Sequence, residues 1–144
     1  MAAETLAAAG HGVDVFDSMA SVGRKFLLAG RGGLNLTHGE PLARFVSRFA
    51  DRQQVLGPLL TAFGPAELRA WAEGLGICTF VGSSGRVFPT DLKAAPLLRA
   101  WLHRLRRQGV AFHMRHRWLG WADDGALRMA TPLGEVRHLP AATV

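Results

Sequence analysis

The sequence has little of what several classes of site require. One cysteine, Cys78, in 144 residues excludes an intramolecular disulfide and any metal or iron–sulfur site built from several cysteines. It lies in an apolar stretch, where we expect a buried thiol that behaves as a small hydrophobe. No apolar run approaches the roughly 20 residues of a membrane-spanning helix, and no basic region precedes an apolar one at the N-terminus, as a secretory signal requires. We therefore expect a cytoplasmic protein without a membrane segment.

The rest of the composition is that of a folded chain. Hydrophobic residues make up 49% and charged residues 19%, and 17 glycines and 7 prolines are too few for a low-complexity chain. We expect one domain over residues 1–144 with a packed core. The 17 cations against 11 carboxylates leave a net charge of +6, so a polyanion has to be considered as a partner.

The N-terminal segment has the pattern of the second half of a dinucleotide-binding unit. A helix is predicted over residues 2–9, Gly10 ends it, and a strand over 13–16 leads into Asp17. In such a unit an acidic residue after the second strand accepts hydrogen bonds from two ribose hydroxyls. An aspartate at this place is equally often a turn former or a helix cap, and the pattern alone leaves both interpretations open. We expect the first strand and its G-x-G-x-x-G turn to lie before Met1.

Residues 18–40 are predicted to form a glycine-rich loop, too long for an ordinary connection and therefore a candidate functional loop. Its part over 21–38 combines three cations with four glycines. Glycines let the backbone approach a flat ring or a phosphate, and backbone N–H groups with Arg and Lys suit an anion. The alternative is a surface loop whose basic residues are incidental.

The remaining pattern predicts a mixed α/β chain. Caps and apolar spacing predict helices over 41–50, 53–63, 65–75 and 93–108, and a strand over 77–81. From residue 110 to the end, turns at 123–125 and 132–134 divide the chain into three strands of a meander. Both ends of the sequence are expected to fall inside regular structure.

Three segments in fixed order resemble one bacterial flavoprotein family. They read VGRKFLLAGRGGLNLTH over 22–38, TFVGSSGRVFP over 79–89 and KAAPLLRAWL over 93–102. They are similar to the aminoacetone-oxidase-like FAD-binding proteins, a family of NAD(P)/FAD-dependent oxidoreductases, and the resemblance covers essentially the whole chain. It implies a partial Rossmann-like FAD-binding domain with a helical segment and a C-terminal meander. It also implies an N-terminal fragment, inactive alone, of an enzyme with an unknown small-molecule substrate and NAD(P)H as a candidate electron donor.

The same resemblance implies which residues contact the cofactor. Asp17 would hold the adenosine ribose, the glycine and basic loop would line the flavin end, and the strand at Trp118 would meet the adenine through its backbone. The implied residues are Asp17, Arg24, Lys25, Gly30, Arg31, Gly32, Gly33, Asn35, Leu36, Thr37 and Trp118. No catalytic residue is implied, because in a flavoenzyme the cofactor carries the redox chemistry.

A basic segment supports a second hypothesis. Between Asp91 and Asp123 there is no carboxylate, while seven cations and three histidines fall there. Residues 99–118 could form a small nucleic-acid-binding module in which Trp118 and Trp121 stack on bases. We favour instead a solvated helix face followed by a charged edge strand, because Trp101 lies on the apolar helix face. We therefore expect no nucleic-acid partner, and a third alternative is a remnant that folds poorly.

The histidines do not predict a metal site. His113 and His116 are three apart on a predicted strand and would point to opposite faces, which excludes joint ligation of one ion. We expect these to be surface histidines.

Overall fold

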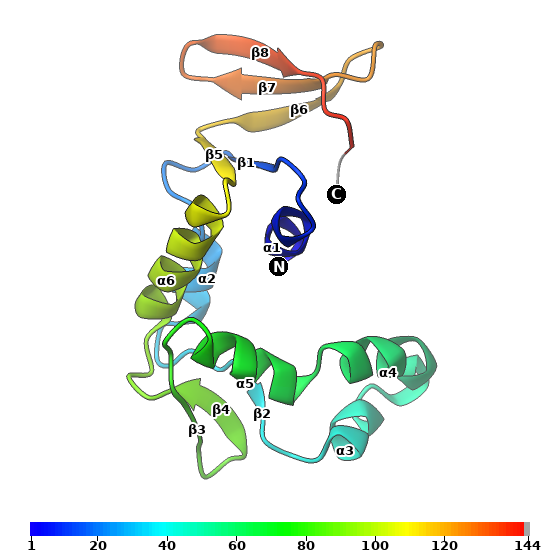
Figure 1. The fold of residues 1–144 in the computed structure, drawn as a ribbon, viewed down its shortest axis with the longest axis vertical. Coiled ribbons are helices and arrows are strands. Elements are labelled where there is room, and N and C mark those ends of the chain that lie inside the picture. Colours follow the sequence, from blue (N-terminus) through cyan, green and yellow to red (C-terminus); the bar gives the residue numbers. More distant parts are fainter. Residues whose placement is uncertain (143–144) are drawn as a thin grey trace. The chain divides into compact units, whose positions relative to one another are not determined.

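The computed structural model describes residues 1–142, and the chain forms two compact units (Figure 1). The first unit contains Met1–Arg24 and the chain from Leu102 onward, and the second contains Lys25–Trp101. In the chain, the division between the units falls within helix α6 (Ala94–Arg107), between Trp101 and Leu102. Among the described residues no helix is both long and apolar enough to cross a membrane. The expectation of one domain over residues 1–144 stays a prediction.

In the first unit, α1 (Ala2–Ala8) leads into strand β1 (Asp14–Asp17), as the N-terminal pattern predicts. Gly10 ends the helix with a φ of +84°, a conformation that glycine adopts without a side-chain clash. β1 pairs in parallel with β5 (Ala111–Met114), in a register that places Asp17 opposite Met114. Both strands therefore end at the same edge, and Asp17 is the last residue of β1 at that edge.

The C-terminal strands β6 (Arg117–Trp121), β7 (Leu127–Thr131) and β8 (Gly134–His138) form an antiparallel sheet in the order β6-β7-β8. This confirms the predicted meander, with one correction. The chain from residue 110 does not enter it as one strand, because Arg115 takes a φ of 59°. This left-handed residue separates β5, which pairs with β1, from β6, which begins the meander.

The second unit combines helices with a small sheet. Its helical elements are α2 (Arg24–Ala29) from its second residue, α3 (Leu42–Ser47), η1 (Ala50–Arg52), α4 (Gln53–Ala62), α5 (Pro65–Glu73) and the first half of α6. Its strands β2 (Thr37–His38), β4 (Arg86–Pro89) and β3 (Thr79–Val81) pair antiparallel in that order. The core is a cluster of buried Leu34, Ala72, Ala94 and Leu97, with Trp71 and other partly buried side chains packed around it.

Two predictions for this unit were wrong. Residues 18–40 are not a continuous loop, since they contain α2 and β2; the run from Arg24 to Ala29 consists largely of good helix formers, which the neighbouring glycines obscured. Cys78 is exposed rather than buried, because it precedes β3 at the surface of the unit instead of lying within the sheet.

Candidate functional site

Asp17 is positioned by the end of β1 and by a local turn. Its Oδ1 accepts a hydrogen bond from the backbone N–H of Met19 at 2.8 Å, and its backbone oxygen accepts one from His116 N–H at 3.0 Å. Among the described residues Oδ2 accepts no hydrogen bond, and the residue is only half-buried. The turn-forming and the ligand-binding interpretations are therefore compatible, because one carboxylate oxygen makes the turn and the other is available.

Arg24 begins α2, directly after Gly23, whose φ is +78°. Its Nε donates to the Ser21 hydroxyl at 3.2 Å, which leaves the two terminal nitrogens of the guanidinium without a partner among the described residues. Both Arg24 and Lys25 are exposed. These two side chains can therefore meet an anion without first breaking an ion pair.

The three glycines after α2, Gly30, Gly32 and Gly33, are each explained by a different feature of their surroundings or backbone. A β-carbon on Gly30 would overlap the methyl of Ala94, the first residue of α6, and one on Gly33 would contact the ring of Phe88 at 3.7 Å. Gly32 has open space around it but a φ of +82°, which side chains rarely tolerate. Ala94 and Phe88 are thus neighbours that the loop sequence does not identify, although both fall in segments that carry the family resemblance.

The chain after these glycines is tied to β4 and the core of the second unit. Leu34 is 5% exposed, and the backbone N–H of Leu36 donates to the Val87 oxygen at 2.8 Å. With its amide nitrogen facing the two carbonyls, Asn35 donates to the Thr37 and Val87 oxygens at 2.8 and 3.3 Å. The Asn35 side chain therefore fixes its own backbone, and Arg31, four residues earlier, is exposed.

Trp118 is the remaining implied residue, and it lies on β6 in the first unit opposite Met129 of β7. Its side chain is 56% exposed. Asp17, Arg24 and Trp118 thus belong to the first unit, and the other eight implied residues to the second.

The histidines correct a sequence prediction. His113, His116 and His138 gather around Phe16, with ring centroids 5.6 to 6.0 Å apart within the trio, so His113 and His116 do not point to opposite faces. The left-handed Arg115 between them breaks the strand alternation. Across the described residues no group of three or more His, Cys, Asp and Glu side chains could hold a metal ion.

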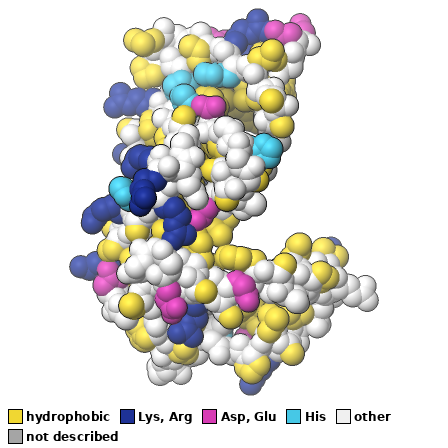
Figure 2. All heavy atoms as spheres, in the orientation of Figure 1, with side chains coloured by type: hydrophobic (Ala, Val, Ile, Leu, Met, Phe, Trp, Pro, Cys, Tyr) yellow, Lys and Arg dark blue, Asp and Glu magenta, His cyan; other side chains and the backbone are white. Residues whose placement is uncertain are grey.

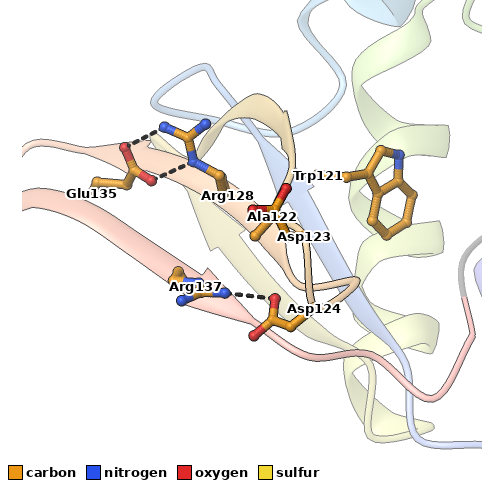
Figure 3. Close-up of a pocket in the computed structure, with 7 residues that line it drawn as sticks. All are labelled: Trp121, Ala122, Asp123, Asp124, Arg128, Glu135 and Arg137. Carbon is orange, nitrogen blue, oxygen red and sulfur yellow. Dashed lines mark hydrogen bonds and ion pairs between the residues drawn. The ribbon is translucent and has the colours of Figure 1, made fainter.

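An open pocket of about 420 Å³ lies on the meander, lined by Trp121, Ala122, Asp123, Asp124, Arg128, Glu135 and Arg137 (Figure 3). Arg128 makes a forked contact with Glu135 at 2.7 and 3.1 Å, and Arg137 donates to Asp124 at 2.5 Å. The hydrogen bonds from Arg128 hold the pKa of Glu135 below its usual value. Both arginines of this pocket are already paired with carboxylates, and none of the residues that the resemblance implies for FAD lines it.

Comparison with known proteins adds one finding. The family model described as the HI0933-like protein Rossmann domain matches residues 1–142. This family binds FAD. No curated protein matches the chain.

Proposed function

Because the chain belongs to the HI0933-like Rossmann domain family of FAD-dependent flavoproteins, we propose that it holds FAD for an oxidoreductase. Bound flavin supplies hydride and electron transfer, and the protein supplies binding and orientation. The proposal includes an unknown small-molecule substrate, NAD(P)H as the electron donor and a cytoplasmic location.

The single observation that carries the proposal is the position of Asp17. In a parallel α/β sheet, ligands bind outside the carboxyl ends of the strands. β1 and β5 are such a parallel pair, and Asp17 is the last residue of β1. Its Oδ2 has no partner among the described residues, so it can accept a hydrogen bond from a ribose hydroxyl while Oδ1 keeps the turn to Met19.

The loop of the second unit is assigned to the flavin end. Lys25 and Arg31 are exposed cations, and Gly32 leaves open space beside its backbone. A flat ring and its neighbouring phosphates need this combination of close backbone approach and positive charge. Arg24, Gly30, Gly33, Asn35, Leu36 and Thr37 complete the assignment as residues that line the FAD site near the flavin, and Trp118 is assigned to the adenine end through its backbone.

Substitution of Asp17 by asparagine tests the assignment without removing the turn, because an amide oxygen can still accept the Met19 N–H. We expect FAD binding, measured by flavin fluorescence titration, to weaken by roughly 1.5–3 kcal/mol, the range of one hydrogen bond to a charged group. Asp17→Ala loses the bond from the Met19 N–H as well as the bond from the ribose hydroxyl, so we expect FAD binding to weaken by roughly 2–4 kcal/mol.

Asp14→Asn is the matched control. Asp14 lies at the opposite end of β1 and contacts His113 Nε2 at 2.6 Å, so its substitution removes the same charge from the same strand and should leave FAD affinity unchanged. Equal affinities for the Asp17→Asn variant and the unsubstituted chain would reduce Asp17 to a turn residue. These measurements use a chain extended upstream through the expected first strand and its G-x-G-x-x-G turn, and absence of FAD binding by that chain would contradict the proposed role of these residues as a whole.

A further inference from the structure

Two tryptophans on β6 are uncovered and lie on one face of the meander. Trp118 is 56% and Trp121 51% exposed, and their ring centroids are 6.1 Å apart at an interplanar angle of 82°. Residues three apart in a regular strand point to opposite faces. Here the pairing shifts between Trp118 and Gly120, so Leu119 is the extra residue of a β-bulge.

The bulge places the rings of Trp118 and Trp121 on the same face of the sheet. Gly120 takes a φ of +121°, and its oxygen accepts a hydrogen bond from Trp118 Nε1 at 3.0 Å. Trp118 pairs with Met129, which is 3% exposed, and Trp121 pairs with Leu127, so both lie on the apolar face of the sheet. Since β6 is an edge strand of this sheet, its end of the apolar face is uncovered.

Trp101 differs from this pair. It packs edge to face on Trp71 with ring centroids 5.0 Å apart, and it is half-buried. The apolar helix face therefore accounts for Trp101, and it does not account for Trp118 or Trp121, which lie on β6.

Cations without a carboxylate partner lie beside the exposed pair in the chain. Arg106 and Arg107 end α6, Arg115 follows β5 and Arg117 begins β6, and all four are exposed. Arg117 pairs with Ala130, so its side chain lies on the face of the sheet opposite to Trp118. In the described part of the chain none of them forms an ion pair, whereas Arg104 contacts Glu4 at 3.0 Å. Figure 2 shows Lys and Arg side chains gathered along α6. These four arginines thus carry positive charge that no carboxylate in the described part of the chain pairs with.

We propose that the side chains of Arg106, Arg107, Arg115, Trp118 and Trp121 bind single-stranded nucleic acid without sequence preference, a function separate from the FAD role, in which Trp118 takes part only through its backbone. Unstacked bases can stack on exposed indole rings, and arginines attract the phosphates between them. Duplex DNA offers the same phosphates but keeps its base faces covered. The sequence led us to expect no nucleic-acid partner, and the uncovered pair on one face is the observation that favours one.

The test uses the full chain and a fluorescein-labelled twelve-nucleotide oligothymidine, with binding measured by fluorescence anisotropy over a range of salt. We expect Trp121→Leu and Trp118→Leu each to weaken binding at least about fivefold, since stacking contributes about 1–3 kcal/mol per base. The double variant Arg107→Gln/Arg115→Gln should lower the slope of log affinity against log salt by about 1.4, because each phosphate contact contributes about 0.7 on single strands.

A matched control separates this site from the general attraction of a basic protein. Arg44→Gln/Arg52→Gln removes the same charge from two exposed arginines that already contact Glu40 and Asp51, and it should leave the salt slope unchanged. Equal slopes for the two double variants would overturn the proposal. So would equal affinity for oligothymidine and for heparin, for phosphatidylserine vesicles or for a duplex of the same length.

Circular dichroism checks that each variant is folded. A second measurement needs no variant, because it uses the unsubstituted chain. In the unsubstituted chain, oligothymidine should quench tryptophan fluorescence and shield it from iodide, because Trp118 and Trp121 are the most exposed of the four tryptophans. Binding that leaves the fluorescence and the iodide accessibility unchanged would show that no base stacks there, and would refute the proposal.

Discussion

Substitution of Gly30 by alanine tests how the candidate flavin loop is held. Gly30 has no left-handed φ, so its backbone conformation admits a side chain. The obstacle is Ala94, because the new β-carbon would overlap the Ala94 methyl. Ala94 is 5% exposed at the start of α6 and belongs to the core cluster of the second unit, so it has little room to move.

The magnitude follows from this contact. Overfilling a packed core costs about 1–3 kcal/mol, which is our expectation for Gly30→Ala. Ala94→Gly should cost about 1–2 kcal/mol, because it removes one buried methyl, at about 0.8 kcal/mol, and places glycine in a helix. With the Ala94 methyl absent, the next atoms lie 3.5 Å from the new β-carbon, an ordinary packing distance. The double variant Gly30→Ala/Ala94→Gly should therefore be about as stable as Ala94→Gly alone.

Urea unfolding followed by tryptophan fluorescence measures all three variants, since Trp71 and Trp101 both belong to the second unit. Gly12→Ala is the control glycine substitution, because Gly12 has neither a left-handed φ nor any neighbour within 4 Å. If Gly30→Ala and Ala94→Gly simply add in the double variant, the two residues do not interact. That result would refute the packing argument, as would a Gly30→Ala variant as stable as the unsubstituted chain.

Two further predictions concern the core and the meander. Leu97 is fully buried and Leu133 is 99% exposed, so Leu97→Ala should lower the free energy of unfolding by about 2–5 kcal/mol, and Leu133→Ala should change it by less than about 0.5 kcal/mol. Because Arg128 lowers the pKa of Glu135, this carboxylate stabilises the fold above its ordinary pKa, and the stabilisation is lost as the pH falls through the lowered value. Thermal midpoints recorded from pH 6 to pH 2 should thus fall less for Glu135→Gln than for the unsubstituted chain, and parallel curves would contradict the ion pair's contribution.

The elements that the sequence predicts well are those in which local signals agree. The helix α6 has an apolar stripe in which Leu97, Leu98 and Leu105 are buried, at the spacing that one helix face requires. The helix α5 has Pro65 in its first turn, and Glu67 accepts the Gly64 N–H at 2.9 Å. Each of these features depends on residues within one or two turns, so it can be recognised without knowledge of the rest of the fold.

The break between β5 and β6 has no such signal. Arg115 adopts a left-handed conformation that is uncommon for residues other than glycine, and its neighbours contain no turn residue. Its backbone N–H donates to the Met19 oxygen at 3.0 Å, and His116 N–H donates to the Asp17 oxygen at 3.0 Å. The conformation is therefore associated with contacts to the segment after β1, almost a hundred residues earlier, which local sequence patterns do not encode.

The glycines of the candidate site show why residue types alone cannot assign a ligand contact. The fold itself requires glycine at position 30, where Ala94 leaves no room, and Gly33 lies against the Phe88 ring with a φ of +122°. Of Gly30, Gly32 and Gly33, only Gly32 combines a left-handed φ with open space beside it. A count of glycines therefore overstates how much of this loop is shaped for a cofactor. The stronger support for a ligand contact comes from the exposed Lys25 and Arg31, because neither forms an ion pair among the described residues. Arg31 also precedes the open backbone position Gly32 in the chain, and a cation next to such a position suits an anionic cofactor.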